Sequence, residues 1–418
     1  MHGTIQAYTA LVRTLASDDS LVLVMVGLPA RGKTYLARKT ARYLNWLGRP
    51  ARVFNVGNYR RSRLGSAQPA SFFDPDNPGG VAARRDLALA ALDDLVAWLG
   101  EAPGRVAIYD ATNATRARRD LVVRRLAEAG LAPVFVESVC TDPAIVEANV
   151  RETKVSMPDY AGADPDAAVA DFRARIAHYE RSYEPVDEDD RSWVKLVDVG
   201  RRVVHNRIQG YLASHVAFFL ANLHITPRPI YLTRHGESAF NVVGRIGGDA
   251  RLSERGRAFA RHLGAWLPER IDGTPQVWTS TLLRTIETAR ALPWPAVALK
   301  NLDEIDAGVY DGWTYGDIEA TAPAEAAARA ADKLRYRYPR GESYEDVISR
   351  LDPVIIELER QREPVVVVAH QAVLRCLYAY FVDLPAEDCP RVDVPLHTVI
   401  ELVPKAYGAA ETRHPIGT

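Results

Sequence analysis

The chain has 418 residues, more than a single hydrophobic core normally organises, so we expect two domains. Hydrophobic residues make up 47% of the sequence and charged residues 25%, a balance that is typical of folded globular proteins and excludes a fibrous or disordered chain. The formal net charge of -1 provides no overall attraction to nucleic acid or to anionic membrane, so any anion must be bound by local groups of cations.

The cysteines and the N-terminal segment indicate the cellular compartment in which the protein acts. The three cysteines, Cys140, Cys376 and Cys389, are far apart and lack the spacing of a zinc site or a disulfide framework, which favours a reducing, cytoplasmic compartment. Residues 1–19 lack a basic segment followed by an apolar core, and no stretch reaches the roughly 20 apolar residues of a membrane span. We therefore expect no targeting signal and no membrane segment.

Apolar, β-rich runs alternate with helical periodicity through the first half. The runs lie at 21–26, 52–56, 105–110, 132–140 and 193–200. This alternation indicates an α/β domain with a mostly parallel sheet and helices on both faces. A helix-like stretch follows at 206–224, and the two prolines of "ITPRP" cannot continue it, so we predict domains at 1–227 and 228–418.

Between the first apolar run and the helix that follows it lies "GLPARGKTY", which matches G-x-x-x-x-G-K-[ST] in full. Glycines let the backbone curl around a phosphate, and amide groups at the helix N-terminus face it. We expect Lys33 to neutralise the charge of this phosphate and Thr34 to hold Mg²⁺. The predicted nucleotide-binding residues are Gly27, Leu28, Pro29, Ala30, Arg31, Gly32, Lys33, Thr34 and Tyr35.

Asp110 ends the run "RVAIYD", the position at which an acid often contacts Mg²⁺ directly or through water. Taken alone, such an aspartate is more often a helix cap or a turn residue; beside the phosphate loop we favour the metal. A small-molecule kinase also needs groups that hold its acceptor. Each candidate cation is individually most often a surface charge, and the candidates are Arg60, Arg61, Arg84, Arg85, Lys154 and Arg175, with Tyr179 beside them.

The second half begins a new α/β series, with apolar runs at 229–236, 276–280, 296–306 and 364–381. The alanine-rich segment at 321–333 is good helix material. No internal repeat occurs. We expect a second, mostly parallel sheet flanked by helices.

The first of these runs leads directly into "TRHGE". A neutral imidazole is a competent nucleophile near pH 7 because its unperturbed pKa is about 6.5. Arg234 next to it can hold phosphoryl oxygens in two hydrogen bonds, and the glycine leaves room for them. We therefore predict that His235 accepts a phosphoryl group.

Three residues downstream fit such a site. Arg284 begins a helix after a strand, His370 follows the four-valine run, and Glu304 could protonate a leaving oxygen. A lone histidine is more often structural. Two histidines at two strand ends, each with suitable neighbours, favour catalysis.

These blocks resemble known families. "TRHGES", "TSTLLRTIETA" and "AHQAV" resemble the phosphoglycerate mutase-like histidine phosphatases. Their pairing with the upstream "GLPARGKTY" resembles the bifunctional 6-phosphofructo-2-kinase/fructose-2,6-bisphosphatase family. The resemblance runs from about residue 20 to 408 through further blocks such as "FFDPDN", "DATNATRARR", "DEIDAG" and "PLHTV".

For the first half, the resemblance implies a P-loop domain that transfers the γ-phosphate of ATP to O2 of fructose 6-phosphate. Lys33, Thr34 and Asp110 would serve ATP and Mg²⁺. The resemblance implies sugar phosphate contacts at Arg84, Thr112, Lys154, Arg175 and Tyr179, with Arg60 and Arg61 as less certain helpers.

For the second half, the resemblance implies hydrolysis of the 2-phosphate of fructose 2,6-bisphosphate through a phosphohistidine on His235. Arg234, Arg284 and His370 would surround the phosphoryl group, and Glu304 would protonate O2. Further implied substrate contacts are Asn241, Gly247, Tyr315, Arg329, Lys333, Tyr344, Gln371 and Arg375.

Alternatives from other classes remain. One is a P-loop polynucleotide or nucleoside kinase fused to a general histidine phosphatase, and another is a chain with one non-catalytic half. Alternating Arg and Tyr at 335–338 could stack single-stranded nucleic acid, but the near-neutral chain disfavours this. We expect small-molecule substrates, no nucleic acid and no membrane. By resemblance we expect a homodimer, and the short tails at both ends disfavour control by tail phosphorylation.

Overall fold

The computed structural model describes residues 20–66, 68–151, 158–160, 162–198, 200–224, 227–405 and 408–417. The chain divides into two compact units: the first runs to Leu223 without residues 45–48, and the second comprises residues 45–48 and the chain from His224 onward. None of the helices in these described ranges combines the length and the apolar composition that crossing a membrane requires.

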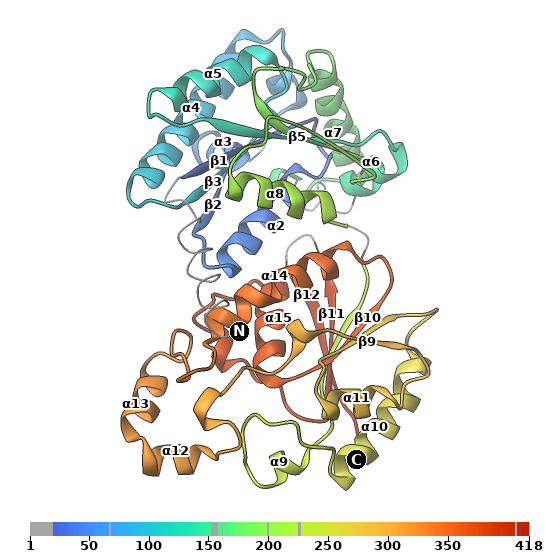
Figure 1. Ribbon diagram of the computed structural model, residues 1–418. Helices are drawn as coiled ribbons and strands as arrows, with labels where there is room; N and C mark the ends of the chain where they lie inside the picture. The colour runs from blue at the N-terminus through green and yellow to red at the C-terminus, as the bar shows by residue number, and fades with distance from the viewer. Residues whose placement is uncertain are drawn as a thin grey trace. The chain divides into compact units, whose positions relative to one another are not determined.

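The first unit is built on a six-stranded sheet with the order β2-β3-β1-β4-β5-β6 (Figure 1). All neighbouring strands are parallel except β5 and β6. The strands are β1 (Leu21–Val26), β2 (Ala51–Asn55), β3 (Val106–Asp110), β4 (Pro133–Val139), β5 (Ser192–Val197) and β6 (Arg202–Asn206). The helices are α2 (Lys33–Trp46), α3 (Val56–Leu64), α4 (Pro78–Gly100), α5 (Arg116–Ala127), α6 (Pro143–Asn149), α7 (Pro165–Glu180) and α8 (Tyr211–Asn222).

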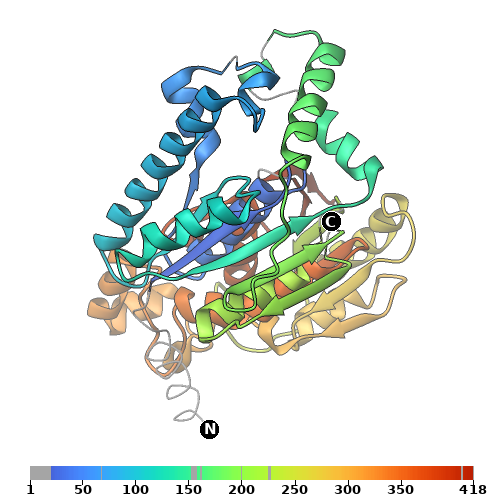
Figure 2. The same ribbon diagram turned by 90° about the horizontal axis from the view of Figure 1, so that it is seen from above.

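Helices cover both faces of this sheet, as predicted. On one face, Val24 of β1 and Tyr109 of β3 pack against Leu92 of α4 and Val122 of α5 in one buried cluster. Figure 2 shows α4 and α5 side by side over the strands, and α2 and α8 lie on the opposite face in Figure 1. Buried on both faces, β1 and β3 read as continuous apolar runs, which is why their positions could be predicted.

The prediction of a helix over 206–224 was partly wrong. Asn206 ends strand β6, and α8 begins only at Tyr211, after Gly210. Strand β6 lies at the sheet edge and is mostly exposed, so it lacks the apolar alternation that would have revealed it.

The second unit has a six-stranded sheet with the order β12-β11-β7-β10-β8-β9, in which β11 is antiparallel to both of its neighbours, β12 and β7, and the other pairs are parallel. The strands are β7 (Ile230–Arg234), β8 (Gln276–Thr279), β9 (Ala296–Ala298), β10 (Val365–Ala369), β11 (Thr398–Pro404) and β12 (Ala409–Pro415). The helices are α9 (Ala239–Val242), α10 (Glu254–Trp266), α11 (Leu283–Ala289), α12 (Tyr315–Thr321), α13 (Pro323–Ala331), α14 (Tyr344–Arg360) and α15 (Gln371–Val382).

The core of this unit lies on both sides of β7 and β10. Phe259 of α10 and Ala289 of α11 pack on one face against Val366 and Val368. Helix α15 contacts β7 and, with α14, covers the other face (Figure 1). The predicted run at 296–306 contains only the three exposed residues of edge strand β9, followed by a short 3-10 helix at Lys300–Leu302.

In each unit, parallel strands bring sequence-distant residues to one edge. Strand β1 ends at Val26, just before Gly27. Strand β3 ends at Asp110, which pairs with Asn55 of β2. Strands β7 and β10 pair with Arg234 opposite Ala369, so His235 and His370 follow adjacent strands. Both predicted sites therefore lie at the carboxyl ends of parallel strands, where ligands bind in open α/β sheets.

Candidate active sites

Hydrogen bonds with three neighbouring segments hold the loop after β1 in place. Gly27 has φ 137° and donates its N–H to Thr112 O at 3.0 Å, and a Cβ atom there would lie 2.4 Å from the carbonyl oxygen of Ser138. The hydroxyl of Ser138 donates to Arg31 O, and Asn149 Nδ2 donates to Ala30 O at 3.1 Å. Only glycine fits at the start of this loop.

Most backbone N–H groups of the same loop have no hydrogen-bond acceptor among the described residues. Within the described ranges, the N–H groups of Ala30, Arg31, Gly32 and Thr34 donate no hydrogen bond, while the N–H of Leu36 already bonds to Gly32 O. The loop also precedes the N-terminus of the fourteen-residue helix α2. Unpaired amides at a helix N-terminus are a binding site for phosphate. The predicted phosphate loop thus presents unpaired amides at a helix N-terminus, and the binding of ATP by its residues stays a prediction.

Lys33 and Asp110 flank this loop and are both buried. Lys33 Nζ donates to Leu28 O at 2.6 Å, and Asp110 Oδ2 accepts from Asn55 Nδ2 at 2.5 Å. The hydroxyl of Thr34 and the second oxygen of Asp110 make no hydrogen bond with described residues. Hydroxyl and carboxylate oxygens are the ligands that Mg²⁺ prefers alongside substrate phosphates, so this pair fits the ion.

A cavity of about 600 Å³ opens beside the phosphate loop. Leu28 and Arg31 form one wall, and apolar side chains such as Val146 of α6 and Ile176 of α7 form the other. A cavity of this volume and composition accommodates a nucleoside. No motif indicated these apolar residues, because they come from helices far apart in the sequence.

The predicted cations of the first unit gather around two adjacent phenylalanines. Arg60 and Arg175 stack on the ring of Phe73, with guanidinium-to-centroid distances of 5.4 and 4.7 Å. Arg84 lies 5.8 Å from the ring of Phe72, and Tyr179 contacts Phe73 as well. The structure therefore brings these four predicted residues together, and Lys154 lies outside the described residues.

Asp159, which the sequence gave no reason to select, lies at the centre of these cations. Its carboxylate pairs with Arg60, with Arg175 at 3.4 Å and with Arg61 at 3.6 Å. Arg175 also pairs with Asp171 at 2.8 Å. Three guanidinium groups facing two carboxylates leave an excess of positive charge, which suits an anionic substrate group.

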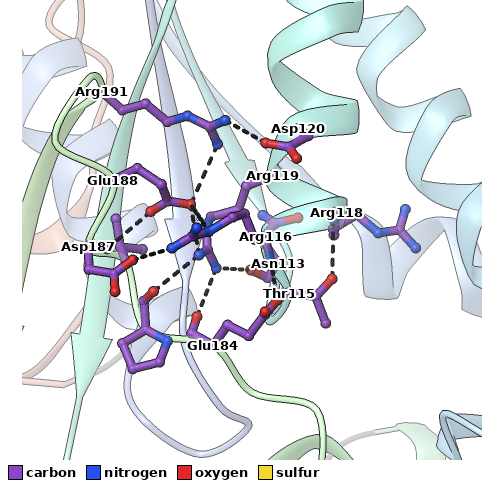
Figure 3. A network of polar contacts seen from close by, with 12 residues as sticks. Asn113, Thr115, Arg116, Arg118, Arg119, Asp120, Glu184, Asp187, Glu188 and Arg191 are labelled. Atoms are coloured by element: carbon purple, nitrogen blue, oxygen red, sulfur yellow. Dashed lines mark hydrogen bonds and ion pairs between the residues drawn. The ribbon is translucent and has the colours of Figure 1, made fainter.

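A buried ion pair fixes the loop that carries Thr112 (Figure 3). Arg119, fully buried on α5, pairs with Glu188 at 2.8 Å and donates to the carbonyl oxygens of Asn113 and Glu184. Asn113 in turn donates to Met25 O at 2.8 Å. These contacts join the segment after β3 to β1 and to the segment before β5, which holds Asp110 and Thr112 beside the phosphate loop.

In the second unit His235 is buried, and its ring tautomer follows from its partners. Nδ1 lies 2.7 Å from Gly236 O and so carries the proton, because a carbonyl can only accept. Nε2 accepts a hydrogen bond from Arg284 Nε at 3.2 Å. Burial, followed by the charge of Arg284, lowers the pKa of His235 well below 6.5. The ring is therefore neutral, with a lone pair on Nε2, as a nucleophile requires.

The groups predicted around His235 are present. The ring of His370 lies 5.1 Å from that of His235, centroid to centroid, and burial followed by Arg284 also lowers its pKa well below 6.5. Arg234 donates to Val394 O at 3.3 Å, and its buried Nε has no partner among the described residues. Two guanidinium groups and two imidazoles thus surround one small volume.

Glu304 lies within range of these cations. Burial lowers the pKa of both Arg234 and Arg284, and the Glu304 carboxylate opposes that shift in each case. Oε1 of Glu304 accepts the N–H of Ala372, at the start of α15, at 3.1 Å. This contact fixes the carboxyl group while leaving Oε2 available for a proton.

A second pocket of this unit contains most of the predicted substrate contacts. Arg329 donates to Tyr315 Oη at 2.9 Å and to Tyr338 Oη at 2.8 Å, while Arg375 donates to Tyr344 Oη at 3.1 Å. The pocket is lined by Glu304, Ile305, Tyr315, Arg329, Lys333, Tyr336, Tyr338, Tyr344, Gln371, Ala372 and Arg375. Tyr336 and Tyr338 were not predicted as contacts.

Lys333 in this pocket has a pKa below the usual value for lysine. Burial, followed by the charges of Arg375 and Arg329, lowers its pKa to about 8. Its Nζ donates to Pro390 O at 3.1 Å. Three cations in one pocket repel each other unless an anion joins them, so the pocket favours a phosphate group.

Two predicted contacts, Asn241 and Gly247, lie in the segment between β7 and α10. Asn241 closes a capping box with Ser238, whose N–H donates to Asn241 Oδ1 at 2.9 Å. Gly247 has φ 70°, and a Cβ atom there would lie 1.8 Å from Asp311 Oδ1. The following residue, Gly248, accepts from Arg284 at 2.6 Å, so this segment borders the histidine site.

Comparison with known proteins matches both units. The model of the 6-phosphofructo-2-kinase family matches residues 9–227, and that of the histidine phosphatase superfamily (branch 1) matches residues 230–414. The 6-phosphofructo-2-kinase/fructose-2,6-bisphosphatase of Gallus gallus is 52% identical over 390 residues, which cover 93% of this chain and 83% of that protein. This chain belongs to the 6-phosphofructo-2-kinase/fructose-2,6-bisphosphatase family.

Other members of the family are about equally similar. The human protein 6-phosphofructo-2-kinase/fructose-2,6-bisphosphatase 4 is 51% identical over 93% of this chain and 83% of its own length. The Arabidopsis thaliana protein is 50% identical over 95% of this chain, which spans 54% of that longer protein. The two-unit organisation of this chain is thus that of a bifunctional family, and the resemblance stated from the sequence is confirmed.

Proposed function

We propose that the chain makes and hydrolyses fructose 2,6-bisphosphate at two separate sites. The observation that carries the proposal is the presence, on one family member, of a phosphate loop with unpaired amides and of a buried, neutral histidine that is flanked by guanidinium groups. The alternative of a polynucleotide kinase is not favoured, because the relatives are sugar phosphate enzymes and the chain is near-neutral.

In the kinase reaction, O2 of fructose 6-phosphate attacks the γ-phosphorus of ATP, the bond to the β-phosphate oxygen breaks, ADP leaves, and the proton of the O2 hydroxyl is released to solvent. The unpaired amides of the loop and Lys33 would hold the phosphates. Bound Mg²⁺, held by Thr34 and Asp110, would offset phosphate charge. Arg60, Arg84 and Arg175, together with Tyr179, would hold the sugar phosphate in line for attack.

In the phosphatase reaction, Nε2 of His235 attacks the phosphorus of the 2-phosphate and the bond from phosphorus to O2 breaks. Glu304 gives its proton to O2, and water then hydrolyses the phosphohistidine to release inorganic phosphate. Arg234, Arg284 and His370 would bind the phosphoryl oxygens. Arg329, Lys333 and Arg375 would hold the 6-phosphate, which fixes the sugar with its 2-phosphate toward His235.

Two assays test the two reactions. The first supplies ATP, Mg²⁺ and fructose 6-phosphate and measures fructose 2,6-bisphosphate. The second supplies the 2-³²P-labelled bisphosphate and measures phosphate release and acid-labile label on the protein. We expect Lys33→Met to abolish only the first activity and His235→Ala only the second. The proposal fails if the wild-type protein shows neither product.

We also propose that the chain acts in the cytoplasm and forms a homodimer. The location is supported by the three cysteines, which are all free and buried. The dimer is supported by the family resemblance. Light scattering coupled to size-exclusion chromatography measures the mass, and a value near 46 kDa would reject the dimer.

A further inference from the structure

Ser280 is a buried hydroxyl that the sequence gave no reason to select. It follows strand β8, is fully buried, and its Oγ lies 2.7 Å from Nε2 of His370. Strands β8 and β10 are parallel with Thr279 opposite Val368, so the residues after both strands lie side by side. Ser280 therefore contacts one ring of the histidine site, that of His370.

The neutral ring of His370 carries one proton, on either Nδ1 or Nε2. Its pKa lies well below 6.5, so at neutral pH it carries one N–H and one lone pair. The partner of Nε2 is Ser280, whereas the buried Nδ1 has no partner among the described residues. Nδ1 is thus the nitrogen available to a phosphoryl oxygen, and the proton must be on Nδ1 if the ring is to donate to it.

The hydroxyl of Ser280 has one hydrogen and three polar neighbours. It accepts the N–H of Leu282 at 3.1 Å and lies 2.8 Å from Oγ1 of Thr285. Ser280 therefore either donates to His370 and accepts from Thr285, or does the reverse. Thr285 permits both arrangements because it also has Leu282 O as an acceptor at 2.8 Å.

We propose that Ser280 donates its hydroxyl hydrogen to Nε2 of His370 and so keeps the proton of this imidazole on Nδ1, where it donates to the transferring phosphoryl group. The reverse arrangement directs a lone pair toward an anionic oxygen, which is repulsive. Ser280 is then a positioning residue that acts through His370. The phosphoryl ligand rests on the proposed phosphatase function, whereas the proton position in the free protein does not.

The proton position is measured by ¹⁵N NMR of histidine-labelled protein without substrate, with the signal of His370 assigned by its loss in His370→Gln. We expect protonated Nδ1 and unprotonated Nε2 in the wild-type protein, and loss of that preference in Ser280→Ala. Thr285→Val removes the other acceptor of Ser280, so its spectrum is the reference for a His370 ring that accepts from Ser280 at Nε2, and the wild-type spectrum is compared with it. We expect it to retain the proton on Nδ1, because Ser280 then has His370 as its remaining acceptor. A proton on Nε2 in the wild-type protein or in Thr285→Val overturns the inference.

Kinetics provide a second readout. We expect Ser280→Ala to lower kcat for fructose 2,6-bisphosphate about tenfold to a hundredfold with little change in KM, and Ser280→Thr to recover most of it. An unchanged kcat in Ser280→Ala overturns the inference. If the wild-type protein hydrolyses no bisphosphate, the proposed function fails while the NMR result still decides the proton position. Should Ser280→Ala not fold, the wild-type and Thr285→Val spectra decide.

Discussion

Arg284 donates a hydrogen bond from Nε to Nε2 of His235 at 3.2 Å, and both side chains are buried. The guanidinium group thus occupies, in the free protein, the direction from which phosphorus must approach. A phosphoryl group that reaches His235 replaces this bond and is itself held by the same arginine. Arg284 therefore keeps the lone pair oriented before the reaction and neutralises the transferred charge during it.

We expect Arg284→Lys to lower phosphatase kcat about a hundredfold, because an ammonium group keeps the charge but loses the planar, two-pronged donor geometry. The measurement is phosphate release under saturating substrate. Arg251→Lys is the matched control, since Arg251 pairs with Glu287 on the surface of the same unit. Equal losses in the two variants would contradict this role.

Glu304→Gln separates proton donation from phosphoryl transfer. The amide keeps the shape and the acceptor for Ala372 N–H but has no acidic proton, so we expect hydrolysis of the bisphosphate to fall about a hundredfold or more. An aryl phosphate such as p-nitrophenyl phosphate has a leaving group that needs no proton, so its hydrolysis should change little. A similar loss with both substrates would mean that Glu304 does not act as the acid.

Much of both sites could be predicted because their residues follow strands that are buried on both faces. His235 and His370 come directly after such an apolar run, Asp110 ends one, and the loop that carries Lys33 follows another; parallel pairing brings the ends of these runs together within each unit. The edge strands were harder. Strand β6 is largely exposed and β9 has three exposed residues, so neither shows an apolar pattern.

Residues that position functional side chains through tertiary contacts could not be predicted from the sequence. Asp159 and Ser280 are small polar residues in stretches without special spacing, and their importance comes from tertiary contacts with Arg175 and His370. The apolar lining of the nucleotide-sized cavity is also assembled from separate helices. Spacing along the chain reports local structure, whereas these contacts depend on the packing of elements far apart in sequence.

The charge of Lys333 predicts a pH dependence of substrate binding. Its pKa of about 8, below the ordinary 10.5, means that the ammonium group loses its proton as pH rises through 8. We expect KM for fructose 2,6-bisphosphate to rise between pH 8 and 9, because a neutral amine binds the 6-phosphate less well, while kcat changes little. In Lys333→Arg the charge persists, so this rise should disappear. A KM that is flat over the same range in the wild-type protein would contradict the assignment.

The buried pair of Arg119 and Glu188 predicts a large effect on stability in the first unit. Arg119→Met removes the nearest cation of the buried Glu188 carboxylate, at 2.8 Å, and leaves only the longer contacts to Arg191 at 3.6 Å and Arg116 at 3.8 Å. Loss of one partner of a buried ion pair typically costs about 3–5 kcal/mol, and these two remaining contacts bring the expected loss to the lower end of that range. Thermal unfolding followed by kinase activity should show a clear decrease in Tm. Arg125→Met is the control. Its pair with Asp93 is on the surface, so we expect a loss of about 1 kcal/mol or less. A double variant, Arg119→Met with Glu188→Leu, should recover part of the stability.

The two buried histidines predict that the second unit loses stability in mild acid. In the folded protein, burial and then Arg284 keep the pKa of His235 and of His370 well below 6.5, so neither ring takes up a proton as pH falls to 6. In the unfolded chain both titrate near 6.5. The unfolded state therefore binds more protons below that pH, and stability present at pH 7.5 is lost as pH falls, by about 1.4 kcal/mol per pH unit for each histidine.

Thermal unfolding of the full chain between pH 7.5 and 5.5, followed by loss of phosphatase activity, measures this slope for the wild-type protein. For His370→Gln, near-ultraviolet circular dichroism replaces the activity readout, and we expect a shallower decrease in Tm because one proton uptake site of the unfolded chain is gone. His262 lies exposed on α10, so His262→Gln should leave the slope as it is in the wild-type protein. If His370→Gln and His262→Gln change the slope equally, the buried ring is not the source of the acid sensitivity.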